Sequence, residues 1–136
     1  MKYTNETEIT DLVLSFENAS IARGVWKHRE HLVVALYYAT HHKLDEAIDV
    51  MRRGLFHLLT EGFKVDLEKE MPYHETLTVF WMKTVADFNA SKNGASLVDK
   101  ANELVESYDK DYPMRFYSRE LLFSDEARGK FVEGDL

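Results

Sequence analysis

This chain of 136 residues contains no cysteine, which excludes disulfide bonds, thiolate metal sites and thiol nucleophiles. It has only two prolines and six glycines, so few residues interrupt a helical pattern. Its longest apolar run, residues 32–39, is far shorter than the ~20 residues that cross a bilayer as a helix. The sequence therefore predicts a protein with no membrane-spanning helix.

Positive charge is also scarce in this chain. Lys and Arg number 17 against 24 Asp and Glu, which gives a net charge of −7, and no basic stripe offsets the imbalance. Such a chain repels a phosphate backbone, which disfavours nucleic-acid binding. Residues 1–6 lack the apolar segment of a signal peptide, so we expect a cytoplasmic protein.

Helical periodicity is the clearest pattern that the sequence does contain. Ile9, Leu12, Val13 and Phe16 follow the i, i+3, i+4, i+7 spacing of an amphipathic helix, which we expect over about residues 6–20. Residues 32–39 are apolar nearly all round, as in a helix at the centre of a bundle. Further helices are expected at about residues 28–41, 45–61, 73–89 and 96–108.

The composition is that of a globular chain, with 45% hydrophobic and 30% charged residues. No segment alternates with a period of two for long enough to indicate a sheet. The sequence therefore predicts an all-α, single-domain bundle of about five helices. We expect the core bundle over about residues 6–110 and a short C-terminal helical arm over about residues 111–136.

Short connections between helices favour antiparallel neighbours. The starts of the helices at 28–41 and 73–89 would then share one end of the bundle, unless a crossover connection intervenes. That arrangement would bring His28, His31, His74 and Glu75 together. These four residues are our candidate site, because titratable groups among apolar neighbours need either internal partners or a function.

Three imidazoles and a carboxylate are suitable ligands for a divalent metal such as zinc or iron. In this interpretation His28, His31 and His74 are metal ligands, and Glu75 is a fourth ligand or a general base that activates water. The spacing lacks the His-Glu-x-x-His pattern of many metal enzymes. The metal is therefore one hypothesis among three.

In the second hypothesis the same residues form a metal-free polar pocket for a small molecule. His74 or His28 would act as the general base there, oriented by Glu75. In the third hypothesis the histidines are structural, with His74 hydrogen-bonded to the hydroxyl of Thr76 or Thr78 or to a tyrosine.

Two other features carry both a structural and a functional interpretation. Arg52 and Arg53 could clamp an anion, although solvated arginines are more common. Trp26 and Trp81 could line a ligand pocket, although aromatic residues at helical spacing usually belong to the core.

The C-terminal arm suggests an alternative to ligand binding. Its apolar residues are too numerous for a free tail, so they cover this bundle or another one. If they cover the bundle of another chain, the protein would be a non-catalytic interaction module and a possible homodimer. The apolar residues of the arm include Phe116, Tyr117, Leu121, Leu122, Phe123 and Phe131.

Segments 26–32, 51–55 and 73–78 resemble those of a family of small, mostly bacterial, uncharacterised all-helical proteins. That family is similar in its W-x-H-x-x-H-L and Y-H-E-T-[IL]-T motifs and in a late segment like residues 122–128. This sequence departs from the pattern at Lys27, Pro72 and Gly134. The resemblance implies no activity or substrate, and it draws attention to the same histidine and glutamate positions.

Overall fold

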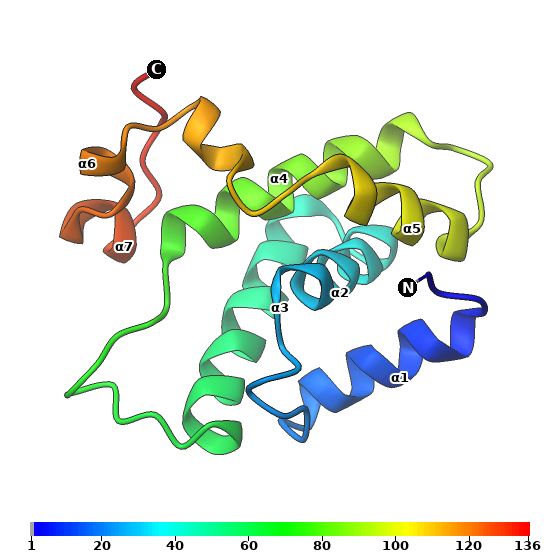
Figure 1. The fold of residues 1–136 in the computed structure, drawn as a ribbon, viewed down its shortest axis with the longest axis horizontal. Coiled ribbons are helices and arrows are strands. Elements are labelled where there is room, and N and C mark those ends of the chain that lie inside the picture. The colour runs from blue at the N-terminus through cyan, green and yellow to red at the C-terminus, as the bar shows by residue number, and fades with distance from the viewer. Residues whose placement is uncertain (1) are drawn as a thin grey trace.

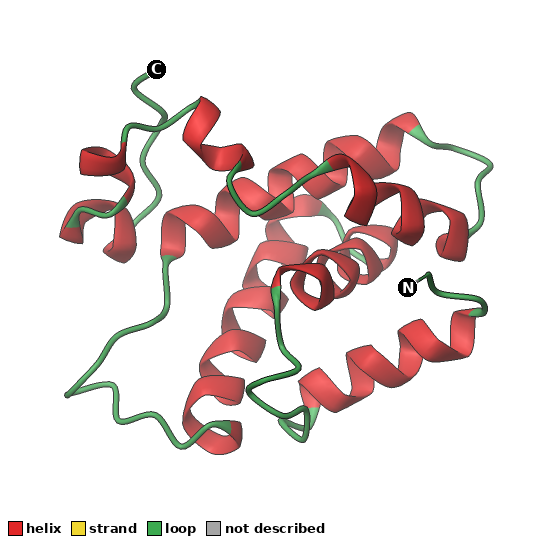
Figure 2. Ribbon diagram, in the orientation of Figure 1, coloured by secondary structure: helices red, strands yellow, loops and turns green. Residues whose placement is uncertain are grey.

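Five helices of 11 to 17 residues form the bundle of the computed structural model, which describes residues 2–136 (Figure 1). No strand occurs within these residues, so the predicted all-α fold is confirmed (Figure 2). Short helical turns follow α3 and α5. The elements are α1 (Glu6–Glu17), α2 (His28–His41), α3 (Leu44–His57), the π-helical turn η1 (Leu58–Gly62), α4 (Glu75–Ser91), α5 (Leu97–Ser107), the 3-10 turn η2 (Tyr112–Arg115), α6 (Arg119–Leu122) and α7 (Asp125–Gly129).

Helix α2 lies at the centre of the bundle and contacts α1, α3, α4 and α5 (Figure 1). Its residues Leu32, Val33, Val34, Ala35 and Leu36 are all completely buried. A helix buried on every side needs apolar residues on every side, which is what residues 32–39 supply. The prediction of a central helix at 28–41 is confirmed.

The other helices begin and end within a few residues of the predicted positions. Helix α1 starts behind an Asn5 cap, whose side chain accepts the Glu8 amide. Helix α4 starts at Glu75 and not at residue 73, because the His74 ring occupies the capping position and accepts the Leu77 amide at 3.2 Å. The helix predicted at 45–61 is α-helical only to His57 and then widens into η1.

Helices α1 and α3 approach each other closely at Gly54. A Cβ atom at this position would overlap the Phe16 ring. That ring is fully buried and stacks on Trp26, with 4.8 Å between the ring centroids. Because residue 54 is glycine, the Phe16 ring of α1 has room to pack against α3 and to stack on Trp26, which precedes α2.

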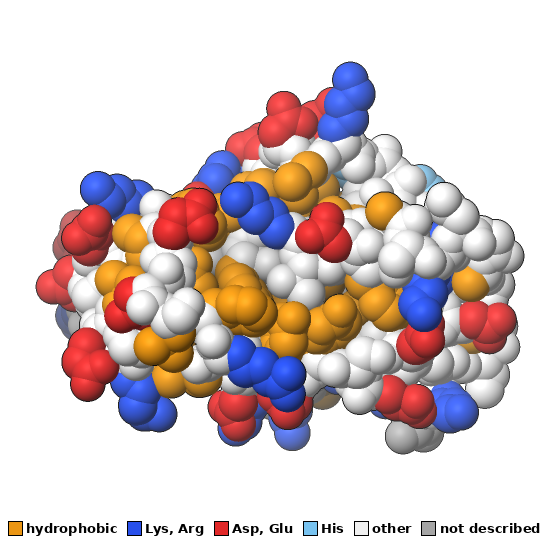
Figure 3. Space-filling view, turned by 90° about the horizontal axis from the view of Figure 1, so that it is seen from above, with side chains coloured by type: hydrophobic (Ala, Val, Ile, Leu, Met, Phe, Trp, Pro, Cys, Tyr) orange, Lys and Arg blue, Asp and Glu red, His pale blue; other side chains and the backbone are white. Residues whose placement is uncertain are grey.

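The C-terminal arm packs on the bundle of its own chain. Tyr117 and Leu122 are 2% exposed. The Thr76 hydroxyl at the start of α4 donates to the Lys130 carbonyl at 2.9 Å and accepts the Val132 amide at 3.2 Å. The arm stands beside the start of α4 in Figure 1, and hydrophobic side chains gather on the face that Figure 3 shows from above. The arm therefore covers part of its own bundle, while Phe116 and Phe123 remain 41% and 47% exposed.

Within residues 2–136, no helix combines the length and the apolar character needed to cross a membrane.

Candidate functional site

A cavity of about 460 Å³ opens where α2 and α4 begin and α3 ends. Three of the four candidate residues, His28, His31 and His74, line it. We call it the His31 cavity. Its complete lining is Arg23, Trp26, Lys27, His28, His31, Leu55, Leu58, Leu59, Phe63, Pro72, Tyr73, His74, Leu77 and Thr78.

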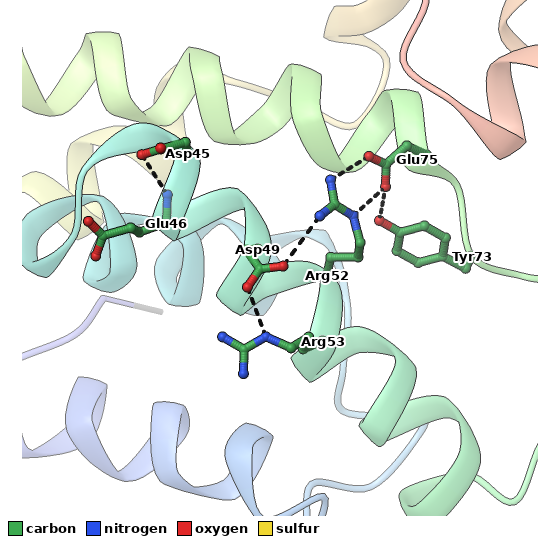
Figure 4. Close-up of polar contacts among 7 residues, drawn as sticks. All are labelled: Asp45, Glu46, Asp49, Arg52, Arg53, Tyr73 and Glu75. Carbon is green, nitrogen blue, oxygen red and sulfur yellow. Dashed lines mark hydrogen bonds and ion pairs between the residues drawn. The ribbon is translucent and has the colours of Figure 1, made fainter.

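Glu75 lies in the wall of a different cavity and faces Arg52 (Figure 4). Arg52 donates from Nε to Oε1 at 2.9 Å and from Nη2 to Oε2 at 2.6 Å, and the Tyr73 hydroxyl donates to Oε1 at 2.5 Å. Burial alone would raise the pKa of Glu75, but these hydrogen bonds outweigh it and lower the pKa. The expected position of Glu75 beside the histidines is therefore corrected, because a bidentate arginine from α3 holds it elsewhere.

His74 uses both ring nitrogens within the protein. Its Nδ1 accepts the Leu77 amide, and its Nε2 lies 2.6 Å from the Leu122 carbonyl. Since a carbonyl only accepts, Nε2 carries the proton and the ring is the neutral tautomer. Burial lowers the pKa of His74 and favours that neutral form. Binding a metal or accepting a proton would require His74 to break one of these hydrogen bonds.

His28 uses one ring nitrogen. Its Nε2 donates to the Tyr108 carbonyl at 3.0 Å, and its ring packs against Trp81 with centroids 4.8 Å apart. This contact joins the start of α2 to the end of α5. It fixes the ring at the His31 cavity, and Nδ1 has no hydrogen-bond partner within residues 2–136.

Of the three histidines that line the cavity, His31 is the one whose ring nitrogens have no hydrogen-bond partner among the described residues. It lies beside Trp26, 6.0 Å between centroids, and lines the cavity. Burial, together with repulsion from His28, lowers the pKa of His31 to about 4. At neutral pH it is therefore an uncharged imidazole with one donor and one acceptor.

The predicted four-residue metal centre is not assembled in this arrangement. Among residues 2–136, no three His, Asp or Glu side chains are grouped so that they could hold a metal ion. The physical reason is that Arg52 holds Glu75 away, while His28 and His74 each direct an Nε2 proton at a backbone carbonyl.

Sequence reasoning missed two residues of the His31 cavity, Arg23 and Phe63. They lie in the connections that precede α2 and follow η1, where no periodic pattern marks a residue, and the Arg23 guanidinium sits 5.7 Å from the Phe63 ring centroid. Trp26 has both of its predicted roles, since it packs on Phe16 and also lines the cavity.

Comparisons with protein-family models, with curated proteins and with solved structures found no match to this chain. The resemblance to the small bacterial family therefore stays a prediction from the motifs.

Proposed function

We propose that the protein binds a small organic anion in the His31 cavity. The observation that carries this proposal is the charge of the lining. Arg23 and Lys27 line the cavity together with three histidines, and no Asp or Glu does. In a chain with a net charge of −7, a cavity whose lining contains Arg and Lys but no acidic residue favours a negatively charged ligand.

The rest of the cavity is suited to an apolar ligand body. Leucines of α3 and η1, the Phe63 ring and the Trp26 ring provide aliphatic and aromatic walls. A volume of about 460 Å³ lies within the range of small-molecule sites, which are largely apolar with a few polar groups that fix orientation. The expected ligand is therefore an aromatic or branched apolar molecule with one acidic group.

His31 supplies a polar contact in the interior of the cavity. Because its imidazole is neutral and makes no internal hydrogen bond, it can donate to one ligand atom or accept from another without losing a partner. Arg23 and Lys27 are exposed at the cavity, so the acidic group of the ligand belongs near the opening. The proposal is for binding alone.

The test is isothermal titration calorimetry of the full chain with naphthylacetate and with its neutral isostere, naphthylacetamide. We expect the carboxylate to bind at least about tenfold more tightly than the amide, which corresponds to ~1.4 kcal/mol. His31→Phe should weaken binding of both compounds, and Arg23→Gln with Lys27→Gln should abolish the difference between them.

Arg53→Gln is the matched control, because Arg53 is exposed on α3, pairs with Asp49 and does not line the cavity. Equal affinities for acid and amide, or no binding of either compound, would contradict the proposal.

A further inference from the structure

A second cavity of about 490 Å³ lies between α3, the start of α4 and α7. Tyr73 lines both cavities, so its side chain forms part of the wall between them. We call the second one the Arg128 cavity. It is the site that contains Glu75, and nothing in the proposed function uses it.

One side of the Arg128 cavity is apolar. The rings of Phe56 and Tyr73 pack with centroids 4.4 Å apart and an interplanar angle of 32°. Met71 extends this surface and is 48% exposed. Methionine and aromatic rings adapt well to an apolar side chain of a ligand.

Four charged side chains line the Arg128 cavity. Two of them neutralise each other, and the other two have no charged partner among the described residues. Arg52 and Glu75 compensate each other through their bidentate contact. Arg128 and Asp125, both on α7, take part in no ion pair and no side-chain hydrogen bond within residues 2–136. They are three residues apart on one short helix and yet are not paired with each other.

Arg128 is the more informative of these two residues because it is partly buried. A guanidinium that has lost part of its hydration normally has an anionic partner. Its planar fork of donors matches a carboxylate, whereas the nearby Asp125 carboxylate matches an ammonium group. The cavity thus presents one unpaired group of each sign beside an apolar surface.

We propose that the Arg128 cavity binds a free α-amino acid with an aromatic or large apolar side chain. The ligand carboxylate pairs with Arg128, its ammonium group pairs with Asp125, and its side chain packs against Phe56, Tyr73 and Met71. A ligand with both charges neutralises both unpaired side chains, which a simple carboxylic acid or a simple amine does not do.

The experiment is calorimetric titration of the full-length His31→Phe variant, in which carboxylate binding to the His31 cavity is weakened, with L-phenylalanine, hydrocinnamate and phenethylamine. The second compound lacks the ammonium group and the third lacks the carboxylate. We expect phenylalanine to bind at least about tenfold more tightly than either. Arg128→Gln and Asp125→Asn should each weaken phenylalanine binding about tenfold or more, with the helical circular dichroism spectrum unchanged.

The matched controls are Arg119→Gln and Glu126→Gln, exposed residues of α6 and α7 that do not line the cavity. Both should bind phenylalanine like the unaltered chain. The proposal is overturned if phenylalanine does not bind, if hydrocinnamate or phenethylamine binds equally well, or if Arg128→Gln has no effect. Phenylalanine should bind the unaltered chain and the His31→Phe variant equally, whereas naphthylacetate should bind the variant more weakly, so failure of the His31 cavity and failure of the Arg128 cavity are distinguishable.

Discussion

The Glu75 carboxylate accepts three hydrogen bonds, two from Arg52 and one from Tyr73, and its side chain is 14% exposed. Arg52 is 35% exposed, so solvent screens part of this ion pair. The contact still joins α3 to α4, and its fork geometry makes it stronger than a typical surface pair. Its main consequence is structural, because it fixes the wall that Tyr73 forms between the two cavities.

We expect Glu75→Gln to lower the free energy of unfolding by about 1–2 kcal/mol, since the guanidinium loses its charged partner. The dependence on pH follows from the lowered pKa of Glu75. The folded state holds the carboxylate ionised below the usual value of 4.5, so its contribution is complete above that value and is lost as the pH falls through the folded-state pKa. Urea denaturation of both proteins from neutral pH down to about pH 3 should show their stabilities converging. A constant difference would contradict the assignment.

The lowered pKa of His31 also makes the stability of the fold depend on pH. This pKa of about 4 lies below the ordinary 6.5, so the unfolded chain takes up a proton more readily than the folded one. The contribution of His31 is complete above 6.5 and is lost as the pH falls towards 4, which should remove about 1–3 kcal/mol. A proton NMR titration that follows the His31 ring should find its midpoint near 4. A midpoint near 6.5 would contradict the buried neutral imidazole.

Among the helices, α4 is attached through its first turn to other segments of the chain, namely α3 and the C-terminal arm. Five polar residues of segment 73–78 have internal partners there. Glu75 accepts hydrogen bonds from Arg52 of α3 and from Tyr73. His74 and Thr76 bond to the C-terminal arm, and the Thr78 hydroxyl donates to the His74 carbonyl at 3.0 Å. Because the polar side chains at this helix start all have hydrogen-bond partners, the segment fixes the positions of the elements around it.

Thr76→Val should release the arm, because the Lys130 carbonyl and the Val132 amide both lose the hydroxyl that pairs them. We expect a loss of about 1–3 kcal/mol in unfolding free energy, with faster amide hydrogen exchange over residues 117–132. Thr10→Val is the control, since the Thr10 hydroxyl bonds only to Thr7 within α1. Unchanged exchange in the arm of the Thr76 variant would contradict this role.

Gly54→Ala tests the contact between α1 and α3. Alanine favours a helix over glycine by about 1 kcal/mol, but its Cβ would overlap the fully buried Phe16 ring. We expect the overlap to dominate, with a net loss of about 1–3 kcal/mol in urea denaturation. Gly129→Ala is the matched helical control, because no atom lies within 4 Å of its added Cβ, and it should not lose stability.

The molecule as a whole is organised around α2, whose central residues are completely buried by the surrounding helices. The arm is hydrogen-bonded to the start of α4, and its few buried residues, which include Tyr117, Leu122 and Ala127, lie outside the main core cluster. We therefore expect the arm and the bundle to unfold together.

Urea denaturation followed by far-ultraviolet circular dichroism and by tryptophan fluorescence should give coincident transitions with one midpoint, as for a two-state domain. Hydrogen exchange at Tyr117 and Leu122 should reach the same opening free energy as exchange in α2. An earlier transition confined to the arm would show that it is an independent unit.

Much of this fold could be predicted from the sequence, because helical periodicity is local. The apolar segment 32–39 identified the central helix, and short connections brought His28, His31 and His74 to one cavity. The fourth candidate, Glu75, could not be placed in the same way. It lies between His74 and Thr76 in the sequence, yet its side chain lines the other cavity.

The sequence by itself determined the helical class, the positions of the main helices and the histidines that gather where α2 and α4 begin. Only the tertiary structure decided what those polar groups do. Arg52, 23 residues before Glu75, neutralises it, and the Leu122 carbonyl, 48 residues after His74, accepts a hydrogen bond from His74 Nε2. Periodicity fixes which face of a helix a residue occupies, but a hydrogen-bond partner is fixed by how distant segments pack. His31 kept its ring nitrogens free for the same reason, since no carbonyl or carboxylate of the packed segments reaches it among the described residues.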